Sequence, residues 1–104
     1  MPDVAIYKAE FFKALGHPLR IRVLERLSEG ERTVSELLEE LGVEQSNLSQ
    51  QLGVLRRAGL VDGRREGANV VYALADPRTA DLLVLARRML LDMVTATRDE
   101  LHAS

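Results

Sequence analysis

Amide and hydroxyl side chains, with no carboxylate among them, are concentrated in the stretch QSNLSQQLGVLRR, from Gln45 to Arg57. Three leucines interrupt it at Leu48, Leu52 and Leu55, and this i, i+4, i+7 spacing places them on one face of a helix. The polar residues then share the opposite face, where each amide offers a donor and an acceptor side by side. That pair matches N6 and N7 of adenine in the major groove of DNA, so this face has the chemistry to read bases.

The candidate base-reading residues lie near the start of this stretch, because the first turns of a recognition helix are those that meet base edges. They are Gln45, Ser46, Asn47, Ser49 and Gln50. Gly53, on the same face, indicates either the close approach of another backbone or a glycine that is merely tolerated. The alternative for the whole face is a solvated polar surface with no ligand.

Two pairs of adjacent arginines follow the amides. Arg56 and Arg57 end the helical stretch, where a cation interacts favourably with the helix dipole, so either one could be structural. Arg64 and Arg65 come before a turn and are better placed to contact phosphates, next to a glutamate that would moderate non-specific attraction. We therefore take Arg57, Arg64 and Arg65 as candidate DNA contacts.

The distribution of charge supports this choice, although the formal net charge of the chain is only -2. Residues 25–44 hold seven Glu against two Arg, a local balance of -5. Residues 45–65 hold one Asp against four Arg, a local balance of +3. One end of the domain can therefore face phosphate while the other repels it.

Helix and turn signals place these residues within a larger arrangement. A first helix is expected over about 3–15 after Asp3 as N-cap, and a second from Pro18 to about 27. The sequence TVSE, a capping box formed by Thr33 and Glu36, opens a third helix over 34–41. Gly42 fits the left-handed position after it, and the fourth helix then runs from 45 to about 58. Two helices joined by a short turn containing glycine form a helix-turn-helix.

The segment that follows changes its hydrophobic period. Apolar β-formers flank the turn-prone Glu66-Gly67-Ala68-Asn69, which predicts a two-stranded hairpin with its tip near Gly67. A last helix is expected from about residue 77 or 78 to beyond Arg98. The chain is thus mainly α-helical with a small β-hairpin.

The last helix is too apolar on one side for a surface element, and the first helix adds further apolar residues. The apolar residues of the last helix recur at alternating spacings of four and three, with a second row beside them. A domain of 104 residues has a modest core, so pairing with a second copy of the chain would bury this stripe. The expected dimer-interface residues are Phe11, Leu82, Ala86, Met89, Leu90 and Met93.

The tract from Leu15 to Pro77, which begins LGHPLRIRVLERL and includes the stretch QSNLSQQLGVLRRAGLVDG, resembles the ArsR/SmtB winged helix-turn-helix repressors over about residues 10 to 80. The resemblance implies that the second helix of the motif reads DNA, that the hairpin is the wing, and that the first and last helices form the dimer interface. It departs from the family pattern at Gln51, where many relatives have histidine, and at Gly53, where lysine is frequent.

The same resemblance implies that the metal sites of the family are lost. The chain contains no cysteine, so the thiolate motif of the third helix is missing. The last-helix pattern D-x-H-x10-H-x2-E, placed on Asp76, meets Arg78, Met89 and Asp92 in its remaining positions. His17, in a Gly-His-Pro turn, is interpreted as a helix-start or packing residue. We expect no metal and no cofactor, with a sensor using oxygen ligands such as Asp76, Asp92 and Asp99 kept as an alternative.

Other classes of function find little support. No histidine accompanies the serines at plausible local distance and no glycine-rich phosphate loop is present, so we expect no enzyme. No secretory signal is recognisable, and no segment approaches the ~18 apolar residues of a membrane span, so no membrane partner and a cytoplasmic location are expected.

The sequence therefore predicts a single winged helix-turn-helix domain over 1–104, with about five helices and a two-stranded wing. It predicts a homodimeric, sequence-specific DNA-binding transcriptional regulator, a repressor that binds double-stranded DNA at an inverted-repeat operator. A winged-helix protein-interaction module without DNA binding is the alternative from another class. The inducing signal is left open.

Overall fold

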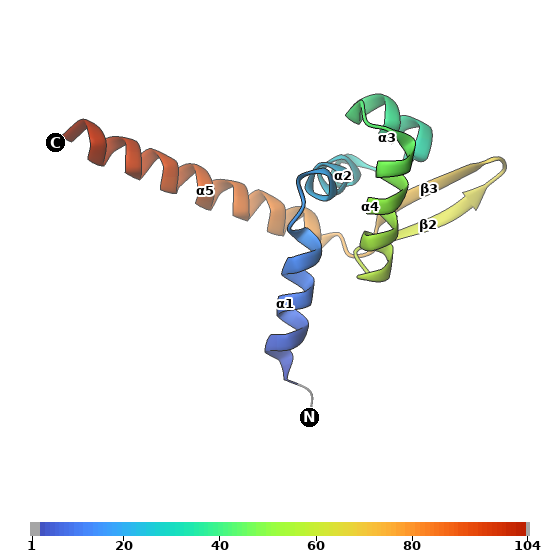
Figure 1. The fold of residues 1–104 in the computed structure, drawn as a ribbon, viewed down its shortest axis with the longest axis horizontal. Coiled ribbons are helices and arrows are strands. Elements are labelled where there is room, and N and C mark those ends of the chain that lie inside the picture. Colours follow the sequence, from blue (N-terminus) through green and yellow to red (C-terminus); the bar gives the residue numbers. More distant parts are fainter. Residues whose placement is uncertain (1–2, 104) are drawn as a thin grey trace.

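The computed structural model describes residues 3–103, which form five helices and three short strands. Figure 1 shows α2, α3, α4 and the hairpin gathered together, with α1 and α5 extending from this group in different directions. The fold therefore consists of a compact part and two protruding arms. The elements are α1 (Val4–Leu15), α2 (Pro18–Glu29), β1 (Arg32–Thr33), α3 (Val34–Leu41), α4 (Gln45–Arg57), β2 (Val61–Glu66), β3 (Asn69–Leu74) and α5 (Arg78–Ala103).

The hydrophobic core lies where α2, α3, α4 and the sheet meet. The side chains that are almost fully excluded from solvent are aliphatic and come from all of these elements. They are Val23, Leu24, Leu37, Leu48, Leu55 and Val61. The leucine spacing in α4 thus predicted its buried face correctly, and the core fixes the opposite face of α4 outward.

Local capping defines the ends of the helices as the sequence predicts. Thr33 Oγ1 accepts from the Glu36 backbone N–H at 3.1 Å, and the Glu36 side chain accepts from the Thr33 backbone N–H at 2.9 Å. Gly42 follows α3 with a φ of 62°, a left-handed conformation that glycine adopts without steric cost, and its N–H donates to the Leu38 carbonyl. His17 Nδ1 accepts from the Leu19 N–H, so its interpretation as a helix-start residue is confirmed.

The sheet has one strand more than the expected hairpin. Its order is β1-β3-β2, all antiparallel, with Arg32 opposite Tyr72 and Thr33 opposite Val71. The two residues of β1 show no strand period of their own and are extended because they pair with β3. The hairpin itself has the expected tip, with Gly67 between β2 and β3 at a φ of 61°.

Tyr72 of β3 packs across the hairpin onto β2 in a way that requires a glycine opposite it. Gly63 of β2 pairs with Tyr72, and a Cβ placed on Gly63 would lie 2.9 Å from the Tyr72 ring. The ring is only 9 % exposed and belongs to the core cluster. The wing is thus joined to the core by a contact between an aromatic ring and a bare backbone.

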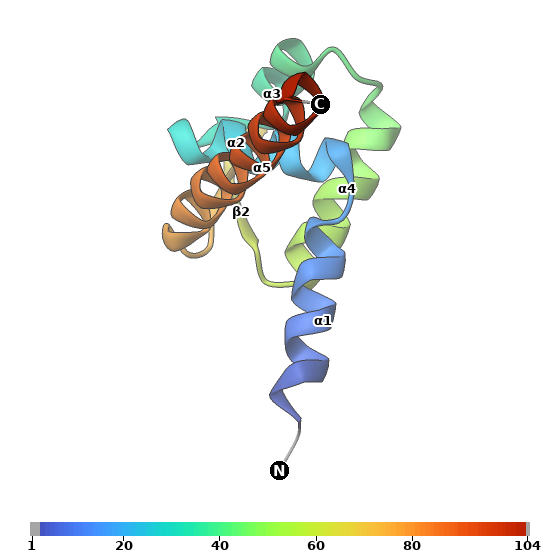
Figure 2. The same cartoon turned by 90° about the vertical axis from the view of Figure 1, so that its left-hand side faces the viewer.

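The two arms carry the exposed apolar surface of the molecule. Figure 1 shows that α5 extends well beyond the other elements, and Figure 2 shows that α1 leaves the compact part in another direction. Large apolar side chains along both arms are about half to three-quarters exposed. They include Ile6, Tyr7, Phe12, Leu85, Met89, Leu90, Met93, Val94 and Leu101.

Candidate nucleic-acid interface

The exposed face of α4 brings the predicted base-reading residues together. The helix starts at Gln45, and its N-cap residue, Glu44, makes no side-chain capping hydrogen bond. The leucines of α4 are buried behind this face, so the outward side chains sit on a fixed helix. The five predicted residues, Gln45, Ser46, Asn47, Ser49 and Gln50, are all exposed.

Arg57 lies at the far end of the same helix and is also exposed. Its guanidinium reaches back over Gly53, where an added Cβ would lie 3.1 Å from Arg57 Nη1. The nearest neighbour of Gly53 within the chain is therefore an arginine side chain and not another backbone. The glycine leaves space for the guanidinium to lie along the helix.

The two wing arginines differ in their surroundings. Arg64 Nη1 and Nη2 donate to the two carboxylate oxygens of Glu31 at 2.9 and 2.7 Å, and Arg64 Nε donates to Glu66 at 3.0 Å. These bonds raise the pKa of Arg64 and lower the pKa of Glu31. Arg65 is exposed, and residues 3–103 offer its side chain no ion pair or hydrogen bond. Arg65 is thus the freer of the two charges for an external phosphate.

A buried polar contact joins α4 to α2. Gln51 is 6 % exposed, and its Oε1 accepts from Arg20 Nη1 at 2.8 Å, while its Nε2 donates to Asn47 Oδ1 at 3.4 Å. Sequence reasoning placed Gln51 only as a departure from a family pattern. The signal that could have found it is its position beside Leu52 on the inward side of the helix, next to a polar residue at i-4.

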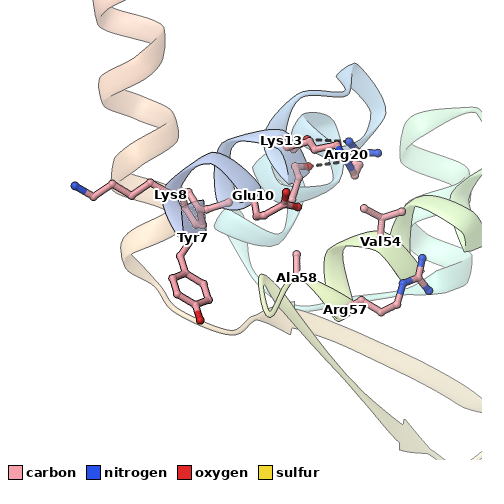
Figure 3. Close-up of a pocket in the computed structure, with 10 residues that line it drawn as sticks. Tyr7, Lys8, Glu10, Lys13, Arg20, Val54, Arg57 and Ala58 are labelled. Carbon is pink, nitrogen blue, oxygen red and sulfur yellow. Dashed lines mark hydrogen bonds between the residues drawn. The ribbon is translucent and has the colours of Figure 1, made fainter. Parts of the chain in front are cut away.

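A groove separates α1 from the second half of α4 (Figure 3). Its volume is about 870 Å³, and Tyr7 and Glu10 of α1 line it together with Val54 and Ala58 of α4. Arg20 closes one end, where Figure 3 shows its hydrogen bonds to the end of α1. The C-terminal end of α1 is therefore tied to α2 through Arg20.

The predicted dimer-interface residues occupy two different environments. Phe11 and Leu82 are half-buried and line a common hollow of about 450 Å³ beside α5. Ala86, Met89, Leu90 and Met93 lie farther along α5 and are exposed.

Despite the length of α5, no helix within residues 3–103 combines the length and hydropathy that a membrane span requires.

The candidate oxygen ligands for a metal ion are dispersed or already occupied. Asp76 accepts three hydrogen bonds from the Arg78 side chain, the shortest of 2.7 Å, and a fourth from the Arg78 backbone N–H. These bonds lower the pKa of Asp76 to about 2. Across residues 3–103 no three His, Asp or Glu side chains are grouped so that they could hold a metal ion. An oxygen-ligand sensor is therefore not favoured.

Comparison with known proteins gives a consistent result. A family model described as a helix-turn-helix domain matches residues 15–64. The uncharacterized HTH-type transcriptional regulator Rv0081 of Mycobacterium tuberculosis is 60 % identical over 84 residues, which are 80 % of this chain and 74 % of the relative. The probable mercury resistance operon repressor of Streptomyces lividans is 41 % identical over 88 residues, 85 % of this chain and 70 % of the relative.

Solved structures extend the similarity to the fold. The crystal structure of Rv0081 from M. tuberculosis has a TM-score of 0.84 and 51 % identity, covering 93 % of this chain and 98 % of that one. The homodimeric winged helix-turn-helix DNA-binding domain of Mb0332 from Mycobacterium bovis, described as a possible ArsR-family regulator, has a TM-score of 0.79 and 30 % identity. That match covers 88 % of this chain and 84 % of the other. The chain belongs to the ArsR/SmtB family of winged helix-turn-helix transcriptional regulators.

Proposed function

We propose that the protein is a homodimeric transcriptional repressor that binds an inverted-repeat operator in double-stranded DNA. One observation carries this proposal: the exposed face of the second helix of the helix-turn-helix is polar and acid-free, and it is held outward by fully buried leucines. A surface of this kind offers directional hydrogen bonds without repelling phosphate.

The residues divide between base reading and backbone contact. The amides and hydroxyls near the start of α4 read base edges or fix phosphates, because the first turns of a recognition helix enter the major groove. Gln50 is the strongest candidate for a bidentate contact, since it is exposed and lies one turn into the helix. Arg57 and Arg65 supply salt-dependent contacts to phosphate. Arg64, whose guanidinium donates two hydrogen bonds to Glu31, makes a further contact.

The apolar arms are the surface that we propose for the second copy. Exposed methionine and leucine side chains on α5, with Phe11 and the apolar residues of α1, form a surface that a partner with the same residues would cover. Two-fold symmetry would then present two recognition helices to successive major grooves, about 34 Å apart along the duplex. The operator is accordingly an inverted repeat with half-sites about one turn apart.

Binding to the DNA upstream of the protein's own coding sequence tests the proposal. The wild-type protein is expected to shift a fragment of that region at low salt and to protect an inverted repeat in a footprint. Gln50→Ala is expected to lower specific affinity more than non-specific affinity, because base contacts carry sequence information. Arg65→Ala is expected to weaken both and to flatten the dependence on salt.

The outcomes separate the alternatives. A folded dimer that shifts no DNA even at low salt supports the protein-interaction module instead. Equal operator binding by the wild type and a Gln50→Ala/Arg65→Ala double variant would overturn the assignment of these contacts while leaving DNA binding in place. Operator affinity that changes on adding Zn²⁺ or Ni²⁺ would revive the metal-sensor alternative.

A further inference from the structure

The buried amide of Gln51 forms the middle of a hydrogen-bonded chain that ends at the DNA-facing surface. Arg20 Nη1 donates to Gln51 Oε1 at 2.8 Å, and Gln51 Nε2 donates to Asn47 Oδ1 at 3.4 Å. Gln51 is 6 % exposed, whereas Asn47, one turn earlier on α4, is exposed. The chain thus connects the interior of the domain to one candidate base-reading side chain.

Arg20 is held in place before it meets Gln51. Its Nε donates to the Ala14 carbonyl at 2.6 Å, and its Nη2 donates to the Lys13 carbonyl at 3.1 Å. These carbonyls belong to the last turn of α1, where helix carbonyls need partners beyond the helix ladder, and the Lys13 carbonyl also accepts from the Gly16 backbone N–H at 3.0 Å. A planar guanidinium held through Nε and Nη2 has little freedom left, so its third nitrogen, Nη1, is directed at Gln51.

The donors and acceptors of the Arg20–Gln51–Asn47 hydrogen bonds are determined by the arginine. A guanidinium can only donate, so the oxygen of Gln51 must face Arg20. The amide nitrogen of Gln51 then faces Asn47 and donates, so the oxygen of Asn47 must face Gln51. The NH2 group of Asn47 is consequently turned away from the buried amide, toward the exposed side.

We propose that Arg20 and Gln51 are positioning residues that hold Asn47 as a hydrogen-bond donor toward DNA, so that Asn47 selects guanine. This inference rests on the proposed DNA-binding function. Guanine presents two acceptors, O6 and N7, at its major-groove edge, and the NH2 group of Asn47 carries two donors. Bidentate pairing with adenine needs the oxygen and the nitrogen of the amide together at the base edge, and the Asn47 oxygen is engaged with Gln51.

Gln51→Glu tests the proposal because it reverses one bond and preserves the rest. A carboxylate of nearly the same shape still accepts from Arg20, but it cannot donate to Asn47. Asn47 must then donate to the new carboxylate and turn its own oxygen outward, where it can accept from the exocyclic amine of adenine or cytosine. The base preference at the position that Asn47 contacts is expected to move from guanine to adenine or cytosine.

The measurement is enrichment of bound sequences from a pool of randomised duplexes, followed by competition binding of single-base operator variants. Asn47→Ala identifies the relevant position as the one whose preference it removes. The guanine-to-adenine affinity ratio there is expected to fall by about tenfold or more in Gln51→Glu. Because the added charge weakens binding to all sequences alike, the ratio is the readout and the absolute affinity is not.

A second variant guards against a loss of folding in the first. Gln51→Met fills a similar volume without hydrogen bonds, so the Asn47 amide can turn freely and the guanine-to-adenine ratio is expected to approach one. The Gln51→Glu/Asn47→Ala double variant is the matched control, and it is expected to show no inversion. Circular dichroism and gel filtration establish which variants are folded and dimeric.

The results distinguish failure of the inference from failure of the function. A wild-type protein that enriches no sequence would contradict DNA reading itself. An enriched operator at which Asn47→Ala removes no base preference would leave the function standing and overturn the role of Asn47. Preferences unchanged in both folded Gln51 variants, or an inversion that persists in the double variant, would overturn the positioning role of Gln51.

Discussion

The helix-turn-helix and the two helical arms use the same aliphatic residues in opposite ways. Leu48 and Leu55 of α4 are fully buried, whereas Leu90 and Met93 of α5 are 60 % and 62 % exposed. In the first region the chain covers its own apolar groups, and polar side chains are left for the surface. In the second region the apolar groups are exposed to solvent. They lie on helices that leave the compact part (Figure 1).

This difference indicates that the two regions depend on different partners. The chain's own core positions α4, so the geometry of this helix is set within one copy. Each arm exposes several large apolar side chains, and exposed apolar surface of this extent marks an interaction site. In the proposed function a second copy covers the arms and DNA contacts the polar face, so each dependence can be tested separately.

Leu90→Glu on α5 is expected to have the largest effect. A carboxylate in the proposed dimer interface would be desolvated without a partner, so the dimer should dissociate. A monomer engages one half-site only, and loss of the second engagement is expected to lower operator affinity by about a thousandfold. Light scattering with gel filtration measures the mass, and titration of the operator measures the affinity.

Thr95→Glu is the matched control, since it adds the same charge to the opposite side of α5 in helical projection. It is expected to remain dimeric and to keep operator affinity. Dissociation by both variants would indicate a general effect of charge on α5, and dissociation by neither would place the dimer interface elsewhere.

Leu55→Ala tests the compact part of the fold, whose core is formed within one copy. Leu55 is fully buried in the core, so truncation leaves a cavity and is expected to reduce the free energy of unfolding by about 3 kcal/mol. The loss should be the same at every protein concentration. Leu90→Ala, by contrast, should lower stability by an amount that depends on concentration, because it acts on association. Urea unfolding at two concentrations compares them.

The wing gives a smaller contrast within the DNA-facing side. Arg64 is balanced inside the protein by Glu31 and Glu66, whereas Arg65 has no such partner among residues 3–103. Arg65→Ala is therefore expected to reduce the slope of log affinity against log salt by about one, and Arg64→Ala by clearly less. Equal slopes for the two variants would show that DNA draws Arg64 away from its carboxylates.

The smallest expected effect is at the junction between β3 and α5. The Arg78 side chain lowers the pKa of Asp76 to about 2, below its ordinary value of 3.8. The pair therefore stabilises the folded chain fully above about pH 4, and this contribution is lost as pH falls through 2. Asp76→Asn should flatten the fall in urea midpoint between these values. The Arg78 side chain is 86 % exposed and the Asp76 side chain 45 % exposed, so solvent screens the pair and the difference is small.

Features set by neighbouring residues were predictable from the sequence. The capping box of Thr33 and Glu36, the left-handed Gly42 and the buried leucine face of α4 each depend on residues within one or two helical turns. These local signals predicted the helix-turn-helix and the exposed polar face, and with them most of the candidate site.

Features set by distant residues were not predictable in the same way. The strand β1 exists through its pairing with β3, about 40 residues later in the chain. The Arg20–Gln51 and Glu31–Arg64 bonds span 31 and 33 residues. In each case the sequence shows a polar or extended residue, and only the fold decides what it meets. The ion pairs of Arg64 and the burial of Gln51 are the parts of the site that depend on such long-range contacts.

The contact between Gly63 and Tyr72 has a consequence for how operators can diverge. A side chain at position 63 would meet the ring at 2.9 Å and would displace either the ring or the strand. Because the ring belongs to the core that also holds α4, such a change is expected to alter the spacing between the hairpin and α4. Relatives with a side chain at this position are then expected to contact DNA with a different distance between the hairpin and the helix.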